Sequence, residues 1–264
     1  MRPKKMLDQA AAALGFTLAL YPMLVWYLHR LGDGSDEPLG LVALAAAAAF
    51  AWFGRRQLLP PGRSGKVAAI VLLAVYGWLA WAGCPPLLRA IPALAAIACW
   101  YGLWRLPAVI ALLILSLPLM ASLQFFLGYP LRLVTAQAST TVLNLFQVGV
   151  VREGAQLVHH GVAVGVDPPC SGLRMLWASA FLAAAVAGKL KLSWRGIFAL
   201  GSAALALAIA ANIVRASLLF FPEAQLVNLP HWMHQGTGNA CFAAGAILLI
   251  ALANRLQPDR ALAV

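Results

Sequence analysis

The chain contains one cysteine in a setting that favours nucleophilic chemistry. Cys170 follows Pro168 and Pro169 and stands at the start of a long apolar segment. Because proline is tolerated only up to the first turn of a helix, a helix is expected to begin at about Cys170. The unpaired N–H groups and the positive dipole end of a helix start stabilise a thiolate, and Arg174 adds a cation one turn later. This setting predicts a reactive thiol whose pKa lies below its usual value of about 8.5, although a small hydrophobic role for Cys170 is the alternative.

A second polar group lies within a later apolar segment. Asn212 and Arg215 are three residues apart, so their side chains share one face of a helix. Arg215 is also twenty residues past Arg195, which places it about 30 Å from the basic end of that helix. At such a position it could stabilise a developing oxyanion, with Asn212 bonding to the guanidinium or to a substrate amide. The alternative that Arg215 only extends to the membrane interface stays open.

Two histidines, His231 and His234, stand just before the last apolar segment. Either could take the thiol proton as a general base and later return it to a leaving amine, and His234 is the first choice. Histidines three residues apart can also form a metal pair, but no carboxylate accompanies them here, so no metal site is expected. Nucleophile, cation and base thus come from three separate segments, a combination that suits acyl transfer without a cofactor.

The composition predicts an integral membrane protein. Of the 264 residues, 62% are hydrophobic and only 10% are charged. Soluble domains carry about 25% charged residues, so this chain has too few charges for a water-soluble surface. Its net charge of +11 is scattered between apolar segments and not gathered on one face, which argues against a nucleic-acid partner. The four cysteines show no C-x-x-C spacing, which favours neither a disulfide framework nor a zinc ribbon.

The elements that must position these residues are expected to form an all-α bundle of about eight transmembrane helices. The expected spans are residues 10–28, 39–53, 67–81, 87–103, 106–127, 173–187, 196–221 and 237–253. Pro118 is expected to kink the fifth span, and the amphipathic residues 129–150 predict an interfacial or site-lining helix. Residues 150–166 predict a short extracytoplasmic β-hairpin before the catalytic helix, with His159 and His160 exposed at its tip. No repeat or linker is visible, so residues 1–264 are expected to form a single membrane domain.

The basic residues predict the orientation. With the N-terminus in the cytoplasm, thirteen of the 19 lysines and arginines fall on the inner side, as the positive-inside rule requires. We therefore expect a multi-pass protein of the plasma or bacterial inner membrane. Cys170 would then face the periplasm or the cell exterior.

Four short motifs resemble those of a known family. They are Val151-Arg-Glu-Gly, Cys170-Ser-Gly-Leu-Arg174, Asn212-x-x-Arg215, and His234 ahead of a glycine-containing last span. In this order and spacing they resemble the exosortase/archaeosortase family over residues 150–256. The resemblance implies a cysteine transpeptidase that recognises a C-terminal signal of the PEP-CTERM kind, made of a short motif, a transmembrane helix and a basic tail. It also implies that Cys170, Arg215 and His234 are catalytic.

Supporting or substrate-binding roles are expected for three neighbours of these residues, Arg174, Asn212 and His231. The expected partners are membrane-anchored proteins that carry such a sorting signal, together with membrane lipid.

Two other functions stay open. The first is a non-enzymatic transporter or anionic-ligand-binding protein, which is disfavoured because the polar groups gather at one membrane face and no repeat is visible. The second is a membrane acyltransferase that uses the same thiol on a lipid donor.

Overall fold

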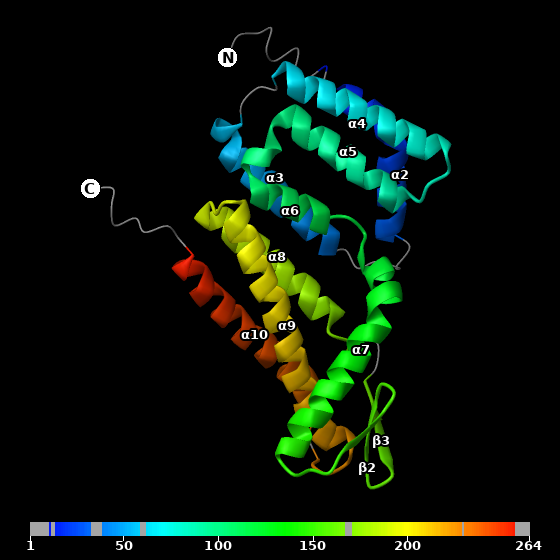
Figure 1. Ribbon diagram of the computed structural model, residues 1–264, viewed down its shortest axis with the longest axis vertical. Helices are drawn as coiled ribbons and strands as arrows, with labels where there is room; N and C mark the ends of the chain where they lie inside the picture. Colours follow the sequence, from blue (N-terminus) through cyan, green and yellow to red (C-terminus); the bar gives the residue numbers. More distant parts are fainter. Residues whose placement is uncertain are drawn as a thin grey trace, which may run out of the picture. The chain divides into compact units, whose positions relative to one another are not determined.

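The computed structural model describes residues 11, 14–32, 39–58, 62–166, 171–228 and 230–256, with the side chains of residues 231–234 outside the description. The chain divides into two compact units, Met1–Leu119 and Met120–Val264. Both units are built mainly of helices, and the second also contains a small β-sheet (Figure 1). The predicted site residues all belong to the second unit.

The first unit is a set of packed apolar helices. Its described elements are α2 (Tyr21–Gly32), α3 (Leu39–Gly54), η1 (Arg55–Gln57), α4 (Arg63–Trp81), α5 (Pro86–Tyr101), η2 (Leu103–Arg105) and α6 (Pro107–Leu115). Helix α4 packs along α5, and α3 packs along α6 (Figure 1). Small residues permit this packing: a Cβ atom at Gly40 would lie 2.5 Å from the carbonyl oxygen of Ser116. That same oxygen accepts a hydrogen bond of 3.0 Å from the hydroxyl of Tyr27.

The predicted fifth span differs from the structure in its boundaries. Helix α6 ends at Leu115, and a new helix, α7 (Met120–Leu145), begins five residues later. Pro118 therefore ends a helix instead of kinking one, because proline has no N–H to donate and its ring clashes with the carbonyl four residues earlier. Helix α7 then continues through Pro130, so residues 120–127 and the predicted amphipathic helix are one element.

Within the described residues, five helices are long and apolar enough to cross a membrane. They are Leu39–Gln57, Arg63–Trp81, Leu173–Leu190, Trp194–Glu223 and Gln235–Arg255, and the count rises to 6 if α6 and α7 together form one broken span. This confirms a helical multi-pass membrane protein, but not the predicted number of eight spans. Helix α5 has only 16 residues, and part of the predicted first span lies outside the described residues.

The second unit is organised around its longest helix. Its elements are α7, three strands, α8 (Leu173–Leu190), α9 (Trp194–Glu223) and α10 (His231–Arg255). Helix α9 packs against α7, α8 and α10 (Figure 1). Pro222 lies in its last turn, so the helix ends one residue later than the predicted stop at that proline. Alanines allow close packing here, since Ala183, Ala204 and Ala253 are buried in one cluster with Leu200 and Leu249.

The predicted hairpin is confirmed and carries one further strand. Strands β1 (Val151–Glu153), β2 (Gln156–His159) and β3 (Val162–Gly165) form an antiparallel sheet in the order β1-β2-β3. His160 and Gly161, with φ of 47° and 81°, make the two-residue turn between β2 and β3. His160 is exposed as predicted, but the exposure prediction is wrong for His159, whose half-buried ring lies edge-on to Phe220 of α9.

The sheet is fixed to the helices at its base and on one face. Asn144 of α7 bonds to Val150 twice, as donor to its carbonyl at 2.8 Å and as acceptor from its N–H at 2.7 Å. Leu157 and Val164, which oppose each other on β2 and β3, are buried against a core that includes Phe220. The sheet is therefore held beside α7 and α9, where it leads the chain toward Cys170.

Candidate active site

The segment that carries Cys170 is anchored on both sides. On its amino side, Arg132 of α7 donates from Nε to the carbonyl of Val166, whose own N–H donates to Ala155 at 2.9 Å. Residues 167–170, which include Cys170, lie outside the described residues. On the carboxyl side the chain resumes at Ser171, which is only 2% exposed. Arg132 belongs to the amphipathic residues 129–150, but the sequence did not predict that it anchors the segment before Cys170.

The predicted start of the catalytic helix is wrong by three residues. Helix α8 begins at Leu173, and its N-cap, Gly172, has a φ of 83° in the left-handed region. A right-handed helix cannot run through that conformation, so α8 does not extend back to Cys170. Arg174 is thus the exposed second residue of α8. The helix-start argument for a lowered thiol pKa therefore no longer applies in its predicted form.

Gly172 lies directly against Asn212 of α9. A Cβ atom at Gly172 would lie 2.7 Å from Cγ of Asn212, closer than any side chain tolerates. Asn212 is 3% exposed, and its Nδ2 donates to Oγ1 of Thr135 on α7 at 3.1 Å. A second contact joins α7 and α9 one turn along, where Oγ of Ser139 donates to the carbonyl of Ile213 at 3.3 Å. The loop after Cys170, α7 and α9 therefore meet at the Asn212 amide.

This junction shows which face of the amphipathic segment packs on α9. Thr135 and Ser139 are four residues apart and both are buried. Polar residues at that spacing in an apolar sequence indicate a buried polar stripe on one helix face. Thr135 was not among the predicted site residues, although this spacing is the signal in the sequence that could have found it.

Arg215 lies one turn after Asn212 and faces α10. Its Nε is buried and makes no hydrogen bond within the part of the chain that the structure describes. A Cβ atom at Gly238 would lie 3.1 Å from that Nε, so the absent side chain makes room for the guanidinium against α10. An arginine that only reached for the interface would place its donors in water. A buried donor without a partner costs free energy and marks a group available to a ligand.

The two predicted histidines belong to the first turn of α10. This helix begins at His231, six residues earlier than the predicted span. His234 is four residues before Gly238, so its backbone position is one helical turn from the residue that contacts Arg215. Among the residues that the structure describes, no three His, Cys, Asp or Glu side chains are grouped to hold a metal ion.

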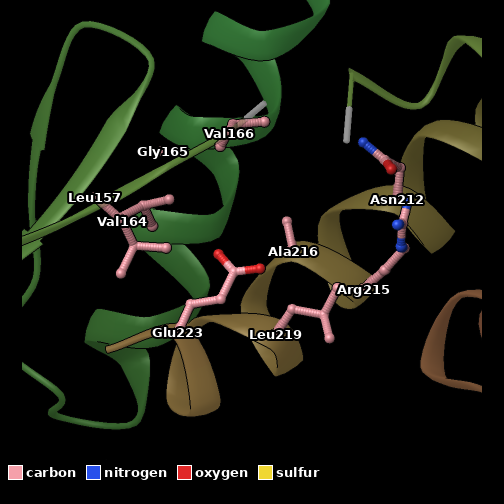
Figure 2. A pocket seen from close by; sticks show the side chains of 9 residues that line it. All are labelled: Leu157, Val164, Gly165, Val166, Asn212, Arg215, Ala216, Leu219 and Glu223. Atoms are coloured by element: carbon pink, nitrogen blue, oxygen red, sulfur yellow. The ribbon is translucent and has the colours of Figure 1, made fainter. Parts of the chain in front are cut away.

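A narrow groove lies between the sheet and α9 (Figure 2). One wall is formed by Leu157, Val164, Gly165 and Val166, and the other by Asn212, Arg215, Ala216, Leu219 and Glu223. The second set follows the i, i+3, i+4, i+7, i+11 spacing of one face of α9. Arg215 and Glu223 place opposite charges toward the two ends of this wall, and Glu223 was not among the predicted site residues.

The family model described as transmembrane exosortase (Exosortase_EpsH) matches residues 32–251. The chain belongs to the transmembrane exosortase family. The match extends the resemblance seen over residues 150–256 to most of the chain, and it includes both compact units. No curated protein and no solved structure matches the chain.

In this exosortase, the described polar groups are suited to bind a carbonyl or oxyanion oxygen. Arg215 brings a cation with a buried donor to the groove, and Asn212 brings an amide held by Thr135. Both side chains come from the long, well-packed helix α9, so little motion is needed to present them. The structure thus brings Asn212 and Arg215 together at the loop that follows Cys170, and it does not bring Arg174 into the same groove.

Proposed function

We propose that this exosortase is a cysteine transpeptidase within the membrane. It would cleave a C-terminal sorting signal, made of a short motif, a transmembrane helix and a basic tail, and transfer the protein to an acceptor. The observation that carries the proposal is the contact between Gly172 and Asn212, one turn before Arg215. Cys170 is only two residues before Gly172, so chain geometry alone keeps their α-carbons within about 7 Å.

In the proposed mechanism, His234 takes the proton of the Cys170 thiol, and the sulfur attacks the scissile carbonyl carbon. The carbonyl electrons move onto oxygen, and Arg215 donates hydrogen bonds to the resulting oxyanion. The C–N bond then breaks as His234 returns the proton to the departing amine of the tail, which leaves a thioester on Cys170. An acceptor nucleophile attacks this thioester and loses its proton to His234, and the proton returns to the released sulfur. His231 is the second candidate for the base.

The membrane setting supports this substrate class. A protein whose signal ends in a transmembrane helix would lie beside the helices of the enzyme, with lipid around both. Its short motif would then be held at the depth of Asn212 and Arg215. The charge distribution supports a cytoplasmic N-terminus and an external active site in the plasma or inner membrane.

The orientation is tested by labelling single cysteines from either side of the membrane. Labels at residues 56–66 and 189–195 are expected to react only from the cytoplasm. Labels at residues 33–37 and 150–166 are expected to react only from outside. A cytoplasmic label in the sheet would reject an external active site.

The reaction is tested with a reporter that carries a C-terminal motif, transmembrane helix and basic tail. Co-expression with the wild-type exosortase is expected to remove the tail, and Cys170→Ala is expected to abolish its removal at equal membrane levels. Cys84→Ala, which changes another thiol in the first unit, serves as the matched control and should retain activity. Tail removal by the Cys170→Ala variant at the wild-type rate would reject the cysteine mechanism. A lipid acyl group found on Cys170, without tail removal, would favour the acyltransferase alternative.

A further inference from the structure

We propose that the outer edge of β3 binds the substrate as an added β-strand. The bound segment would be the extended stretch of about four residues on the amino side of the scissile bond. This inference rests on the proposed function and deepens it, because it assigns the substrate a backbone conformation and a binding surface.

The hydrogen bonding of the sheet shows which peptide groups of β3 face away from β2. The N–H of Val166 donates to Ala155, so Val166 points toward β2. Peptide groups alternate in direction along an antiparallel strand. Val164, paired with Leu157, therefore also points toward β2, whereas Ala163 and Gly165 direct their N–H and C=O groups to the outer edge.

That outer edge has no partner strand among the described residues, because β3 is the last strand in the order β1-β2-β3. An unpaired edge is a template for another strand, and proteins normally shield such edges. Here Gly165 lines the groove beside α9, so its outward peptide group belongs to the part of the edge next to Asn212 and Arg215 (Figure 2). A free donor and a free acceptor at a groove wall are complementary to the backbone of an extended peptide.

The length of the groove matches a short extended peptide. Arg215 and Glu223 are eight residues apart on α9, a rise of about 12 Å. An extended chain covers that distance in about four residues. Leu157, Val164 and Leu219 are buried walls of the groove, so the bound segment would be held mainly by backbone hydrogen bonds to the edge of β3, with Arg215 at one end.

The direction of the bound segment follows from the proposed mechanism. Asn212 and Arg215 mark the scissile bond, and the groove continues from them toward the end of α9 at Glu223. The part of the substrate beyond the cleavage site is a membrane helix and cannot lie extended in the groove. The residues before the cleavage site are therefore assigned to the edge of β3.

The test measures amide hydrogen exchange residue by residue in the Cys170→Ala exosortase, with and without the tripartite-signal reporter. At a reporter concentration 100 times its Kd, exchange at Gly165 is expected to slow on the order of 10²-fold, and Ala163 should follow. The control is the N–H of Arg152, which points outward from β1 at the far edge of the sheet and should be unchanged. Unchanged exchange at Gly165 overturns the inference. If protection at Gly165 instead rises with the exosortase concentration in the absence of reporter, a second copy of the chain binds the edge, and the inference is also overturned.

A pair of variants at one position gives an independent readout. Gly165→Pro removes the outward N–H, which an edge strand tolerates, whereas Gly165→Ala keeps it. Reporter capture by the Cys170→Ala protein is expected to weaken about tenfold with proline and little with alanine. Equal capture by both variants contradicts the inference. Reporter bound at β3 but still processed by the Cys170→Ala variant would reject the cysteine mechanism and leave this inference standing.

Discussion

Replacing Gly172 with alanine is expected to disrupt the active site through one close contact. The new Cβ would lie 2.7 Å from Cγ of Asn212, where ordinary contacts begin at about 3.4 Å, so the loop or the amide must move. The left-handed backbone at φ of 83° adds a cost of about 1–2 kcal/mol for any residue with a side chain. Overpacking adds typically about 1–3 kcal/mol. Together these predict a loss of about 2–5 kcal/mol in the free energy of unfolding.

Gly149→Ala separates the two costs. Gly149 lies in the same unit with a φ of 69°, but nothing lies within 4 Å of its added Cβ. This variant should lose only about 1–2 kcal/mol and keep its activity. Gly172→Ala should lose processing activity on the order of 10²-fold, because a shift of about 1 Å displaces the segment of Cys170. Tail removal from the reporter and denaturant unfolding in detergent measure the two effects. Equal activity in both variants would refute the claim that the Gly172 contact sets the position of the loop.

Two further predictions concern the partners of this contact. Arg215→Lys should lower processing about 10²–10³-fold because lysine lacks the planar guanidinium. The control is Arg89→Lys, which should stay active; the Nε of Arg89 is likewise buried without a described partner. Comparable processing rates for the two variants at matched membrane levels would reduce Arg215 to an interface anchor. Thr135→Val should cost about 1–3 kcal/mol in unfolding free energy because it removes the hydroxyl that accepts a hydrogen bond from the buried Asn212 amide. Thr141→Val on the exposed side of α7 should cost less than about 0.5 kcal/mol. Similar unfolding curves for the two variants would remove Thr135 from the site.

The composition and the hydrophobic segments were sufficient to predict a helical membrane protein with a small β element before α8. These features depend on local patterns, namely long apolar segments and a two-residue turn at His160 and Gly161. The break at Pro118 was misjudged because proline ends a helix or kinks it according to the contacts around it. The ends of α6 and α7 are set by packing that a single sequence does not display.

The candidate site was predicted only in part, because local spacing is visible in the sequence whereas packing between distant segments is not. The spacing of Asn212 and Arg215 placed both on one face of α9, as the structure has them. The start of α8 was missed because the two prolines before Cys170 suggested a helix start, whereas the left-handed Gly172 sets the boundary. Glu223 was missed because the groove depends on how β3 lies along α9, a contact between segments far apart in the sequence.

The central claim is that Cys170 forms a thioester with the carbonyl of its substrate. Hydroxylamine attacks thioesters, so adding it to membranes that contain the exosortase and the tripartite-signal reporter should release a reporter that ends in a hydroxamate. Mass spectrometry of the reporter C-terminus reads out this product. We expect the hydroxamate with the wild-type protein and no cleavage with Cys170→Ala. A cleaved reporter with a free carboxylate, formed equally by both proteins, would contradict it.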